Sequence, residues 1–241
     1  MRSALSFLTV LGRAERPNGR TLSWFPLVGL VVGAVVGLVW WGAGRIWPAA
    51  VAAVLAVAAD AAVTGGLHLD GLADSADGLL APVDRERRLA IMRDPRVGVF
   101  GAVALIVVLF ARTSALAAVA AKPLVLVGLW CGSRTLMAAA ARALPYAREE
   151  GGLASSFEAD TRRRAGMPAW AGVTAYGLAA AVLCVVLGAG TRGLVLVAVE
   201  VLTMAAVLWL AIRRIGGYTG DVLGAGGVLA ETAALLALVA R

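Results

Sequence analysis

The 241-residue sequence has little cysteine, lysine or histidine, and the first two scarcities narrow the class of protein. Its two cysteines, Cys131 and Cys184, lie in separate apolar segments, which argues against a disulfide framework and a thiolate metal cluster. Lys122 is the single lysine, so arginine carries nearly all of the positive charge behind the net charge of +7. The arginines lie in short segments between apolar runs, which is typical of membrane topology. We therefore expect no nucleic-acid partner.

The N-terminal segment lacks a convincing signal-peptide cleavage site. Arg2 precedes a short apolar run, residues 4–11, and charged residues follow it at Arg13, Glu15, Arg16 and Arg20. A cleaved signal peptide is therefore not expected. The run is instead predicted to form a helix at the membrane interface.

Long apolar runs are what the sequence has in excess, since 61% of its residues are hydrophobic. Soluble domains reach only about 45–50%, and a helix crosses a bilayer with about 17–25 apolar residues. The sequence predicts one all-α, integral-membrane catalytic domain, residues 1–241, with about seven transmembrane helices. Their predicted positions are residues 24–44, 48–65, 97–115, 120–141, 168–190, 193–212 and 222–240.

The distribution of arginine predicts the orientation of this bundle. Most arginines lie in the N-terminal segment and in residues 66–96, 142–167 and 213–221, on one side of the predicted spans. The positive-inside rule assigns that side to the cytoplasm. We therefore expect a multi-pass protein of the cell inner membrane, with its N-terminus and its active site facing the cytoplasm.

One segment departs from the apolar composition, namely TGGLHLDGLADSADGLL at residues 64–80. Asp70, Asp74 and Asp77 have i, i+4, i+7 spacing, which places them within an arc of about 60° on a helix. No Lys or Arg in the segment neutralises them. Grouped carboxylates suit a hard dication such as Mg²⁺ better than zinc. We predict these three aspartates to be metal ligands; a solvated acidic loop is the alternative.

A second segment, GGYTGD at residues 216–221, has a similar pattern of glycines followed by an aspartate. Asp221 is predicted to be a further metal ligand or a catalytic base. Gly217 and Gly220 are predicted to let backbone amides approach a phosphate. A glycine-rich turn between two membrane helices is the alternative.

The segment MRDPRVGVFG, residues 92–101, precedes another apolar run. Arg93 and Arg96 can clamp phosphate oxygens, and Asp94 can orient them. Simple topology anchors are the alternative. His68, the single histidine, is a candidate catalytic base or phosphate contact, and a structural histidine is the alternative.

Three charged residues interrupt apolar runs, at Asp60, Arg134 and Glu200. Charges are costly inside a membrane, so each is expected to face the interior of the bundle and a partner. Arg112 and Lys122 are expected to bracket a turn between two helices.

These segments together resemble the cobalamin synthase family, the adenosylcobinamide-GDP ribazoletransferases. The resemblance spans nearly the whole chain, and its most specific motif is GGLHLDGLADSADGL at residues 65–79. The segment FLTVLGR, residues 7–13, departs from the opening usual in the family. The other matching segments are FPLVG at 25–29, MRDPRVGVFG at 92–101, LPYAR at 144–148 and GGYTGDVLGA at 216–225.

The resemblance implies that the phosphocobinamide group of adenosylcobinamide-GDP is transferred to α-ribazole or its 5′-phosphate. The products are adenosylcobalamin or its phosphate, together with GMP, and Mg²⁺ is required. A homo-oligomer, or a complex with other enzymes of cobalamin assembly, is compatible with such a protein.

The chemistry of this reaction matches the residues already selected. Metal-bound carboxylates neutralise a diphosphate, and a carboxylate or an imidazole activates an alcohol. Asp70, Asp74, Asp77 and Asp221 are the predicted Mg²⁺ ligands, and His68, Asp77 and Asp221 are the predicted catalytic residues. Two other classes stay open: a CDP-alcohol phosphotransferase that makes lipids, whose acidic motif is similar, and a membrane transporter.

Overall fold

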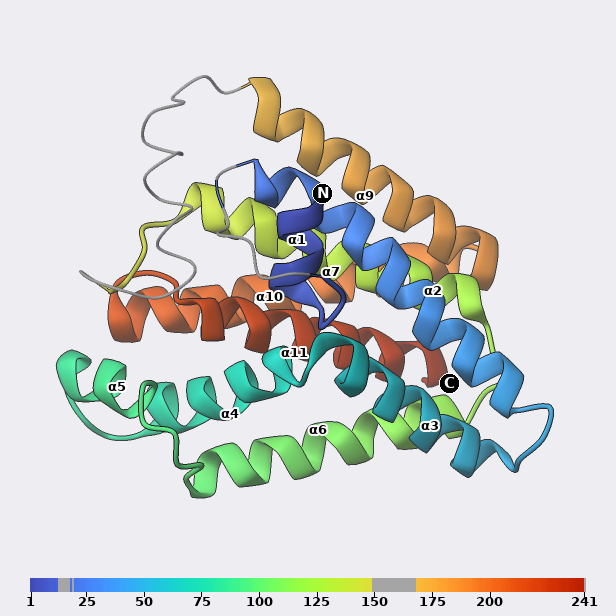
Figure 1. Ribbon diagram of the computed structural model, residues 1–241, viewed down its shortest axis with the longest axis horizontal. Helices are drawn as coiled ribbons and strands as arrows, with labels where there is room; N and C mark the ends of the chain where they lie inside the picture. The colour runs from blue at the N-terminus through green and yellow to red at the C-terminus, as the bar shows by residue number, and fades with distance from the viewer. Residues whose placement is uncertain (13–17, 19, 149–167, 241) are drawn as a thin grey trace.

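In a computed structural model of the chain, residues 1–12, 18, 20–148 and 168–240 are described. The described residues form helices joined by short connections, and no strand occurs among them (Figure 1). This confirms the predicted all-α class. The bounds are α1 Arg2–Leu8, η1 Thr21–Trp24, α2 Phe25–Ala43, α3 Ala49–Thr64, α4 Leu67–Leu80, α5 Arg85–Ile91, α6 Val99–Ala117, α7 Pro123–Ala143, α9 Pro168–Ala189, α10 Arg192–Ile215 and α11 Gly220–Val239.

Each of the seven predicted apolar runs is a helix in the structure, with ends that differ by a few residues. Among the described residues, six helices are long and apolar enough to cross a membrane, with spans at Thr21–Ala43, Val99–Ala117, Pro123–Ala143, Ala171–Ala189, Arg192–Ile215 and Gly220–Val239. The protein is therefore a multi-pass membrane protein.

The remaining run, α3, meets the same test only together with α4, from which it is bent by 90°. α6 contacts both helices. Asp77 of α4 lies at the first turn of α6, and Asp60 of α3 bonds Arg112 in the second half of α6. The bent pair thus follows α6 along most of its length, which favours one broken span and a total of seven.

Two consecutive glycines produce the bend between α3 and α4. Gly65 has φ 61° and Gly66 has φ 71°, both in the left-handed region that glycine enters without steric cost. Gly65 ends α3 and Gly66 precedes the first residue of α4. The glycine pair therefore directs the aspartate-bearing helix away from the axis of α3.

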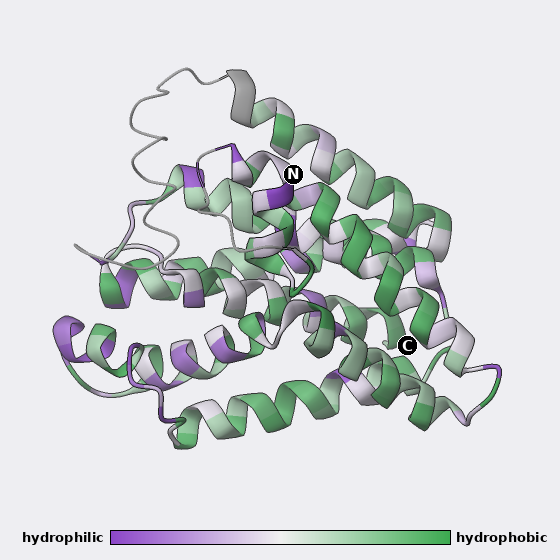
Figure 2. Cartoon of the chain, viewed as in Figure 1, coloured by the Kyte–Doolittle hydropathy of each residue, from purple (hydrophilic) through white to green (hydrophobic). Residues whose placement is uncertain are grey.

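α7 and α11 form the centre of the bundle, since 78% and 72% of their spans are buried. The spans of α6, α9 and α10 are only 28%, 17% and 22% buried, so their apolar side chains are available to lipid (Figure 2). α2 packs closely on α7 through Gly29, Gly33 and Gly37. A Cβ atom on any of these three glycines would lie within about 3 Å of α7 backbone atoms, a close approach that is common between membrane helices.

Charged residues join the central helices inside the bundle. Arg112 bonds Asp60 at 2.8 Å and also pairs with Glu231, which in turn pairs with Arg134. Asp60 and Arg134 thus have the interior partners predicted for them. The expectation for Arg112 was wrong, because it lies within α6 and is buried. Its charge is neutralised by two carboxylates, so it does not need a position at the membrane surface.

Glu200 in α10 is also buried, which confirms its predicted position in the interior of the bundle. The partner predicted for it is not found among the described residues. Neither carboxylate oxygen has a hydrogen-bond partner among the described residues. The carboxylate lies against Gly132 of α7, where a Cβ atom would come within 2.4 Å of Oε2.

The polar residues of the described chain gather at one end of the bundle (Figure 2). α5, the end of α4 and the turn between α10 and α11 lie there, while the connections α2–α3 and α6–α7 lie at the other end (Figure 1). Arginines are numerous at the polar end, at Arg85, Arg87, Arg88, Arg93, Arg96, Arg142, Arg148, Arg213 and Arg214. The cytoplasmic location of this end, and of the N-terminus, stays a prediction. Arg13, Glu15, Arg16 and residues 149–167 lie outside the described residues.

The apolar N-terminal run forms α1, whose Ala4 and Leu8 are fully buried against the bundle. The predicted helix is confirmed, and one of its faces packs on protein. The backbone N–H of Val10 donates to the carbonyl of Val63 at 2.9 Å, and the hydroxyls of Ser3 and Thr21 bond at 3.0 Å. These contacts hold α1 over the start of α4.

Candidate active site

The acidic motif forms α4, as its spacing predicts, and α11 lies against it. Gly71 makes this approach possible, since a Cβ atom there would lie 2.8 Å from the carbonyl oxygen of Asp221. Asp70 is exposed, whereas Asp74 and Asp221 are partly buried. The charges of Asp70 and Asp221 act on Asp74 more strongly than the charge of Asp77 does, and Arg148 is a cation that opposes them. Three predicted ligands therefore share one electrostatic environment.

Asp77, the third aspartate of the motif, has a different position. Its carboxylate accepts hydrogen bonds from the backbone N–H of Gly98 at 2.7 Å and of Gly101 at 2.9 Å. These amides belong to the open N-terminus of α6, so Asp77 caps that helix from another segment. A Cβ atom on either glycine would come within 2.5 Å of the carboxylate. The structure thus gives Asp77 a capping contact, and its roles as metal ligand and catalyst stay predictions.

Asp221 lies in the first turn of α11, where Thr219 caps the helix. Its Oδ2 atom accepts a hydrogen bond from Arg148 Nη2 at 2.7 Å and one from Thr219 Oγ1 at 3.1 Å. Arg148 comes from the segment after α7 and also donates to the carbonyl of Met92 at 3.2 Å. Arg148 therefore connects three parts of the chain beside the acidic residues.

Backbone pairing holds the segment 144–148 in place. Ala147 N–H donates to the carbonyl of Tyr218 at 2.8 Å, and Tyr218 N–H donates to the carbonyl of Pro145 at 3.0 Å. A Cβ atom on Gly217 would lie 2.2 Å from the same Pro145 oxygen, so the absence of a side chain at this position leaves room for the segment. Burial raises the pKa of Tyr146, although Arg148 opposes the shift, so its hydroxyl stays protonated at neutral pH. The predicted phosphate contact of Gly217 stays a prediction.

His68 is 4% exposed and lies next to the buried ion network. Its Nδ1 atom is 3.5 Å from Arg134 Nη2. A guanidinium only donates, so Nδ1 accepts and Nε2 carries the hydrogen. Nε2 has no partner among the described residues. His68 is therefore a hydrogen-bond donor positioned at the site, and its catalytic role stays a prediction.

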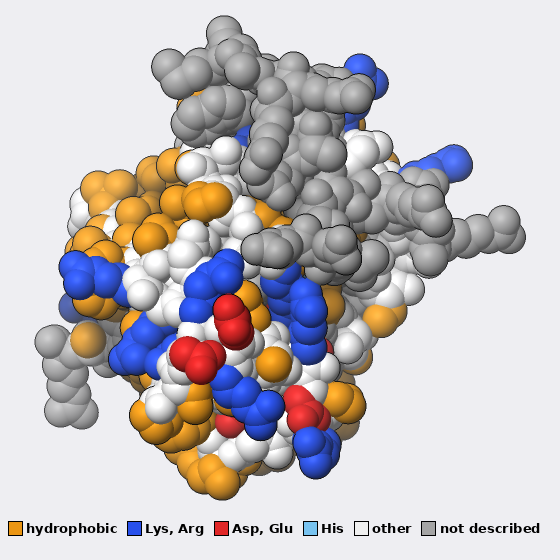
Figure 3. All heavy atoms as spheres, turned by 90° about the vertical axis from the view of Figure 1, so that its left-hand side faces the viewer, with side chains coloured by type: hydrophobic (Ala, Val, Ile, Leu, Met, Phe, Trp, Pro, Cys, Tyr) orange, Lys and Arg blue, Asp and Glu red, His pale blue; other side chains and the backbone are white. Residues whose placement is uncertain are grey.

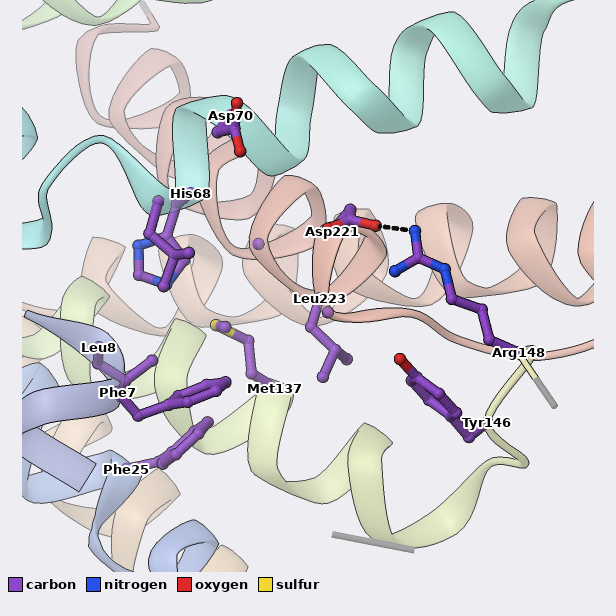
Figure 4. Close-up of a pocket in the computed structure, with 13 residues that line it drawn as sticks. Phe7, Leu8, Phe25, His68, Asp70, Met137, Tyr146, Arg148, Asp221 and Leu223 are labelled. Atoms are coloured by element: carbon purple, nitrogen blue, oxygen red, sulfur yellow. Dashed lines mark hydrogen bonds and ion pairs between the residues drawn. The ribbon is translucent and has the colours of Figure 1, made fainter. Parts of the chain in front are cut away.

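A cavity of about 140 Å³ lies between α1, α4 and α11 (Figure 4). Phe7, Leu8 and Phe25 form one apolar side of the cavity (Figure 4). Met137 and Leu223 add further apolar lining nearer its middle (Figure 4). His68, Asp70, Asp221, Arg148 and Gly220 supply the polar part of its lining. The predicted residue Gly220 thus lines a cavity, whereas Gly217 does not appear among its lining residues.

A wider and more open hollow of about 520 Å³ adjoins the cavity, and Arg148 lines both. Arg85 and Arg93 also line the hollow, so its charged lining is mainly positive. Arg85 is fixed by hydrogen bonds to the carbonyls of Ile215 at 2.9 Å and Ala147 at 2.7 Å. Figure 3 shows this end of the molecule, with basic side chains around the acidic ones. Of the two arginines predicted to clamp phosphate, Arg93 lines this hollow.

Arg96 does not line the hollow, and its side chain is 86% exposed. Asp94 holds it through two hydrogen bonds, of 2.9 Å to Nε and 2.6 Å to Nη2. These bonds lower the pKa of Asp94 to about 2, so the pair is intact at neutral pH and is lost as the pH falls through that value. The orienting contact predicted for Asp94 exists, but it is made to Arg96 rather than to Arg93.

No group of three His, Cys, Asp or Glu side chains in the described ranges converges closely enough to hold a metal ion alone. Mg²⁺ commonly uses one or two carboxylates and takes further oxygens from substrate phosphates and water. Asp70, Asp74 and Asp221 offer oxygen donors only, and their combined charge exceeds that of Arg148. The residues therefore fit Mg²⁺ in donor type and charge.

Sequence reasoning did not identify Arg148, Tyr146 or Arg85 as site residues. Arg148 and Tyr146 belong to the LPYAR segment, which was noted only as a family motif. Arg85 gave no signal beyond its charge. The apolar side of the cavity was also missed, because Phe7 and Phe25 resemble any other membrane-facing aromatic residue in the sequence.

Comparison with known proteins gives one consistent family. The family described as cobalamin-5-phosphate synthase matches residues 1–239. A relative from Chlorobaculum parvum is 41% identical over 96% of this chain and 91% of its own length. One from Bradyrhizobium diazoefficiens is 40% identical over 100% of this chain and 93% of its own length. Both carry the name adenosylcobinamide-GDP ribazoletransferase, and no solved structure matches the chain.

Proposed function

Because this chain belongs to the cobalamin-5-phosphate synthase family, we propose that it is an adenosylcobinamide-GDP ribazoletransferase. It transfers the phosphocobinamide group of adenosylcobinamide-GDP to α-ribazole or its 5′-phosphate and releases GMP. The observation that carries this proposal is the pair of adjoining hollows at the polar end of the bundle, one basic and one partly apolar. The Arg148–Asp221 ion pair lies between them.

The basic hollow suits the diphosphate of the donor. Arg85, Arg93 and Arg148 present guanidinium groups there, and a guanidinium can donate two parallel hydrogen bonds to phosphate oxygens. Arg85 is already fixed by two backbone carbonyls, so less conformational entropy is lost when it binds. The hollow is open to solvent, which a donor with a large corrinoid requires.

Asp70, Asp74 and Asp221 are the residues that would hold Mg²⁺. When bound, the ion would withdraw charge from the diphosphate oxygens. The three carboxylates repel one another without it, and Arg148 opposes only part of this repulsion. Asp77 is a fourth candidate whose oxygens already accept two amides.

The chain's own residues supply the rest of the chemistry. A hydroxyl oxygen of α-ribazole forms a bond to the phosphorus that carries cobinamide, and the bond from that phosphorus to the bridging oxygen breaks. GMP leaves with the bridging oxygen. We assign Asp221 to accept the hydroxyl proton, because it lines the cavity and adjoins the basic hollow through Arg148. Arg148 holds the Asp221 carboxylate in position and contacts the leaving phosphate.

The location of the site follows from the same proposal. The polar end of the bundle faces the cytoplasm, where nucleotides and Mg²⁺ are available, and the apolar spans lie in the inner membrane. The protein is thus embedded in the lipid bilayer and does not use lipid as a substrate.

An assay of the purified protein in detergent tests the proposal. GMP and a cobalamin product are expected from adenosylcobinamide-GDP and α-ribazole with Mg²⁺, and not when EDTA replaces Mg²⁺. Asp74→Asn should reduce turnover by about 100-fold or more, because it removes a charged ligand. Asp84→Asn is the matched control, since asparagine caps a helix as well as aspartate, and Asp84 caps α5.

Other outcomes would support the competing classes. Release of CMP from CDP-diacylglycerol would indicate a lipid-synthesising phosphotransferase. Solute flux in proteoliposomes without chemical turnover would indicate a transporter. Full activity of Asp74→Asn would remove the metal assignment at that position.

A further inference from the structure

We propose that the cavity beneath α1 binds the aromatic base of the acceptor nucleoside and holds the nucleoside's hydroxyl toward Asp221. This inference rests on the proposed function and names the place where its second substrate binds. It assigns a substrate-binding role to α1 and to Phe7, Leu8 and Phe25.

The apolar side of the cavity is suited to a flat ring. Phe7 and Phe25 stack on each other with ring centroids 5.9 Å apart and an angle of 23° between the planes. Both rings line the cavity beside Leu8 (Figure 4). A cavity of about 150 Å³ lined by apolar side chains is large enough to bind benzene. The present cavity, of about 140 Å³, can therefore take a six-membered ring while the rest of the nucleoside extends toward its open side.

The polar side of the cavity is suited to the ribose. Asp70 and Asp221 accept hydrogen bonds, as a ribose hydroxyl requires. His68 Nε2 carries a hydrogen and is buried without a partner among the described residues. A buried donor left unpaired costs free energy, which a nucleoside acceptor atom would recover. His68 is thus a recognition group for an oxygen or ring nitrogen of the nucleoside.

The two hollows differ in a way that separates the two substrates. The cavity is lined by six large apolar side chains, which suit an aromatic ring, and by two carboxylates, which can accept hydrogen bonds from hydroxyl groups. The adjoining hollow is lined by three arginines, which attract a diphosphate. Arg148 and Asp221 stand at the junction, so the acceptor hydroxyl and the donor phosphate meet there. The aromatic base of the acceptor therefore belongs under α1, and the diphosphate of the donor outside it.

A comparison of kinetic constants tests this assignment on the full-length protein in detergent. Phe7→Ala should raise the KM for α-ribazole about tenfold or more, because stacking of a base on an aromatic ring contributes about 1–3 kcal/mol. The KM for adenosylcobinamide-GDP should change less than about twofold. Phe110→Ala is the matched control, since Phe110 lies on α6 with 72% of its surface exposed and is expected to leave both constants unchanged.

A milder variant guards against loss of folding. Phe7→Leu keeps an apolar side chain against the bundle and removes only the ring, so its thermal unfolding should match the wild type while the α-ribazole KM still rises. Calorimetric titration with α-ribazole, and with benzimidazole alone, measures binding without turnover. Both ligands should bind the wild type and bind Phe7→Ala more weakly.

The outcomes separate this inference from the proposed function. If the folded Phe7 variants keep the wild-type KM for α-ribazole, or raise the KM of the donor instead, the cavity does not bind the acceptor. If the wild type binds α-ribazole but releases no GMP, the proposed reaction fails while the binding site stands.

Discussion

At the scale of single residues, the acidic motif contains two kinds of aspartate. The charges of Asp70 and Asp221 act on Asp74, and Asp70 and Asp221 both line the cavity. Asp77 instead accepts two amides at the start of α6. Helical spacing placed all three on one face, but it could not distinguish a residue that faces the site from one that faces a neighbouring helix.

This difference gives a prediction about stability. Asp77→Ala should lower the free energy of unfolding by about 0.5–2 kcal/mol, the usual effect of removing a capping side chain. Asp70→Ala is the control from the same helix, and it should leave stability unchanged because Asp70 is exposed. Thermal unfolding in one detergent compares the two. A stable Asp77→Ala protein that lacks Mg²⁺-dependent turnover would show instead that Asp77 acts as a ligand.

Glu231 shows how a central residue escapes sequence reasoning. It lies in an apolar run, yet it pairs with both Arg112 and Arg134 at the centre of the bundle. Ser133 donates a further hydrogen bond to it at 2.6 Å. Arg134 also contacts His68, which lies in the first turn of α4. The buried network therefore supports the start of α4. Glu231 therefore stabilises the site without touching either hollow.

At the scale of helices, close packing through glycine joins α2 to α7. Gly33 faces the backbone of α7. At Gly42 of the same helix, a Cβ atom would have no neighbouring atom within 4 Å. The two positions thus differ in tertiary contact and share their secondary structure. α2 also contributes Phe25, its first residue, to the lining of the cavity.

Alanine at these two positions gives a matched test. Gly33→Ala should destabilise the protein by about 1–3 kcal/mol, because its Cβ would lie 2.6 Å from the carbonyl oxygen of Leu126. Gly42→Ala should be neutral or stabilise by up to about 1 kcal/mol through helix propensity alone. Thermal unfolding of both variants in one detergent measures the difference. Equal shifts would mean that α2 and α7 are not packed as the structure shows.

At the scale of the whole molecule, the bend between α3 and α4 determines the number of crossings. If the bent pair crosses as one span, the chain crosses seven times and its two ends lie on opposite sides. If the pair is a re-entrant loop, the chain crosses six times and both ends lie on one side. Contacts of both α3 and α4 with α6 favour the first arrangement.

Reporter fusions distinguish the two topologies. Fusions at Ile46 and Ala120 should report the outer side, and a fusion at Val83 the cytoplasm, because the bent pair separates Ile46 from Val83. A fusion after the last residue should report the outer side. Green fluorescent protein and alkaline phosphatase at each site serve as mutual controls, since each is active on one side only. A cytoplasmic C-terminus would contradict the broken span and the seven-helix count.

The sequence by itself determined the membrane class, the seven apolar helices and the helix that carries the aspartates. These features depend on the period of the α-helix, on the length of apolar runs and on paired glycines, which are properties of short stretches of chain. The family motifs likewise pointed to the reaction before any contact was known. The polar end of the bundle followed from the same local patterns.

Only the tertiary structure decided which side chains meet. Asp77 bonds amides more than 20 residues away, Arg148 bonds Asp221 across 73 residues, and Phe7 reaches the same cavity as Leu223. Such contacts depend on the crossing and spacing of helices that are distant in the chain, and the period of one helix holds no information about its neighbour. The same apolar face of α1 could have met lipid, and packing against the bundle made it one wall of a cavity.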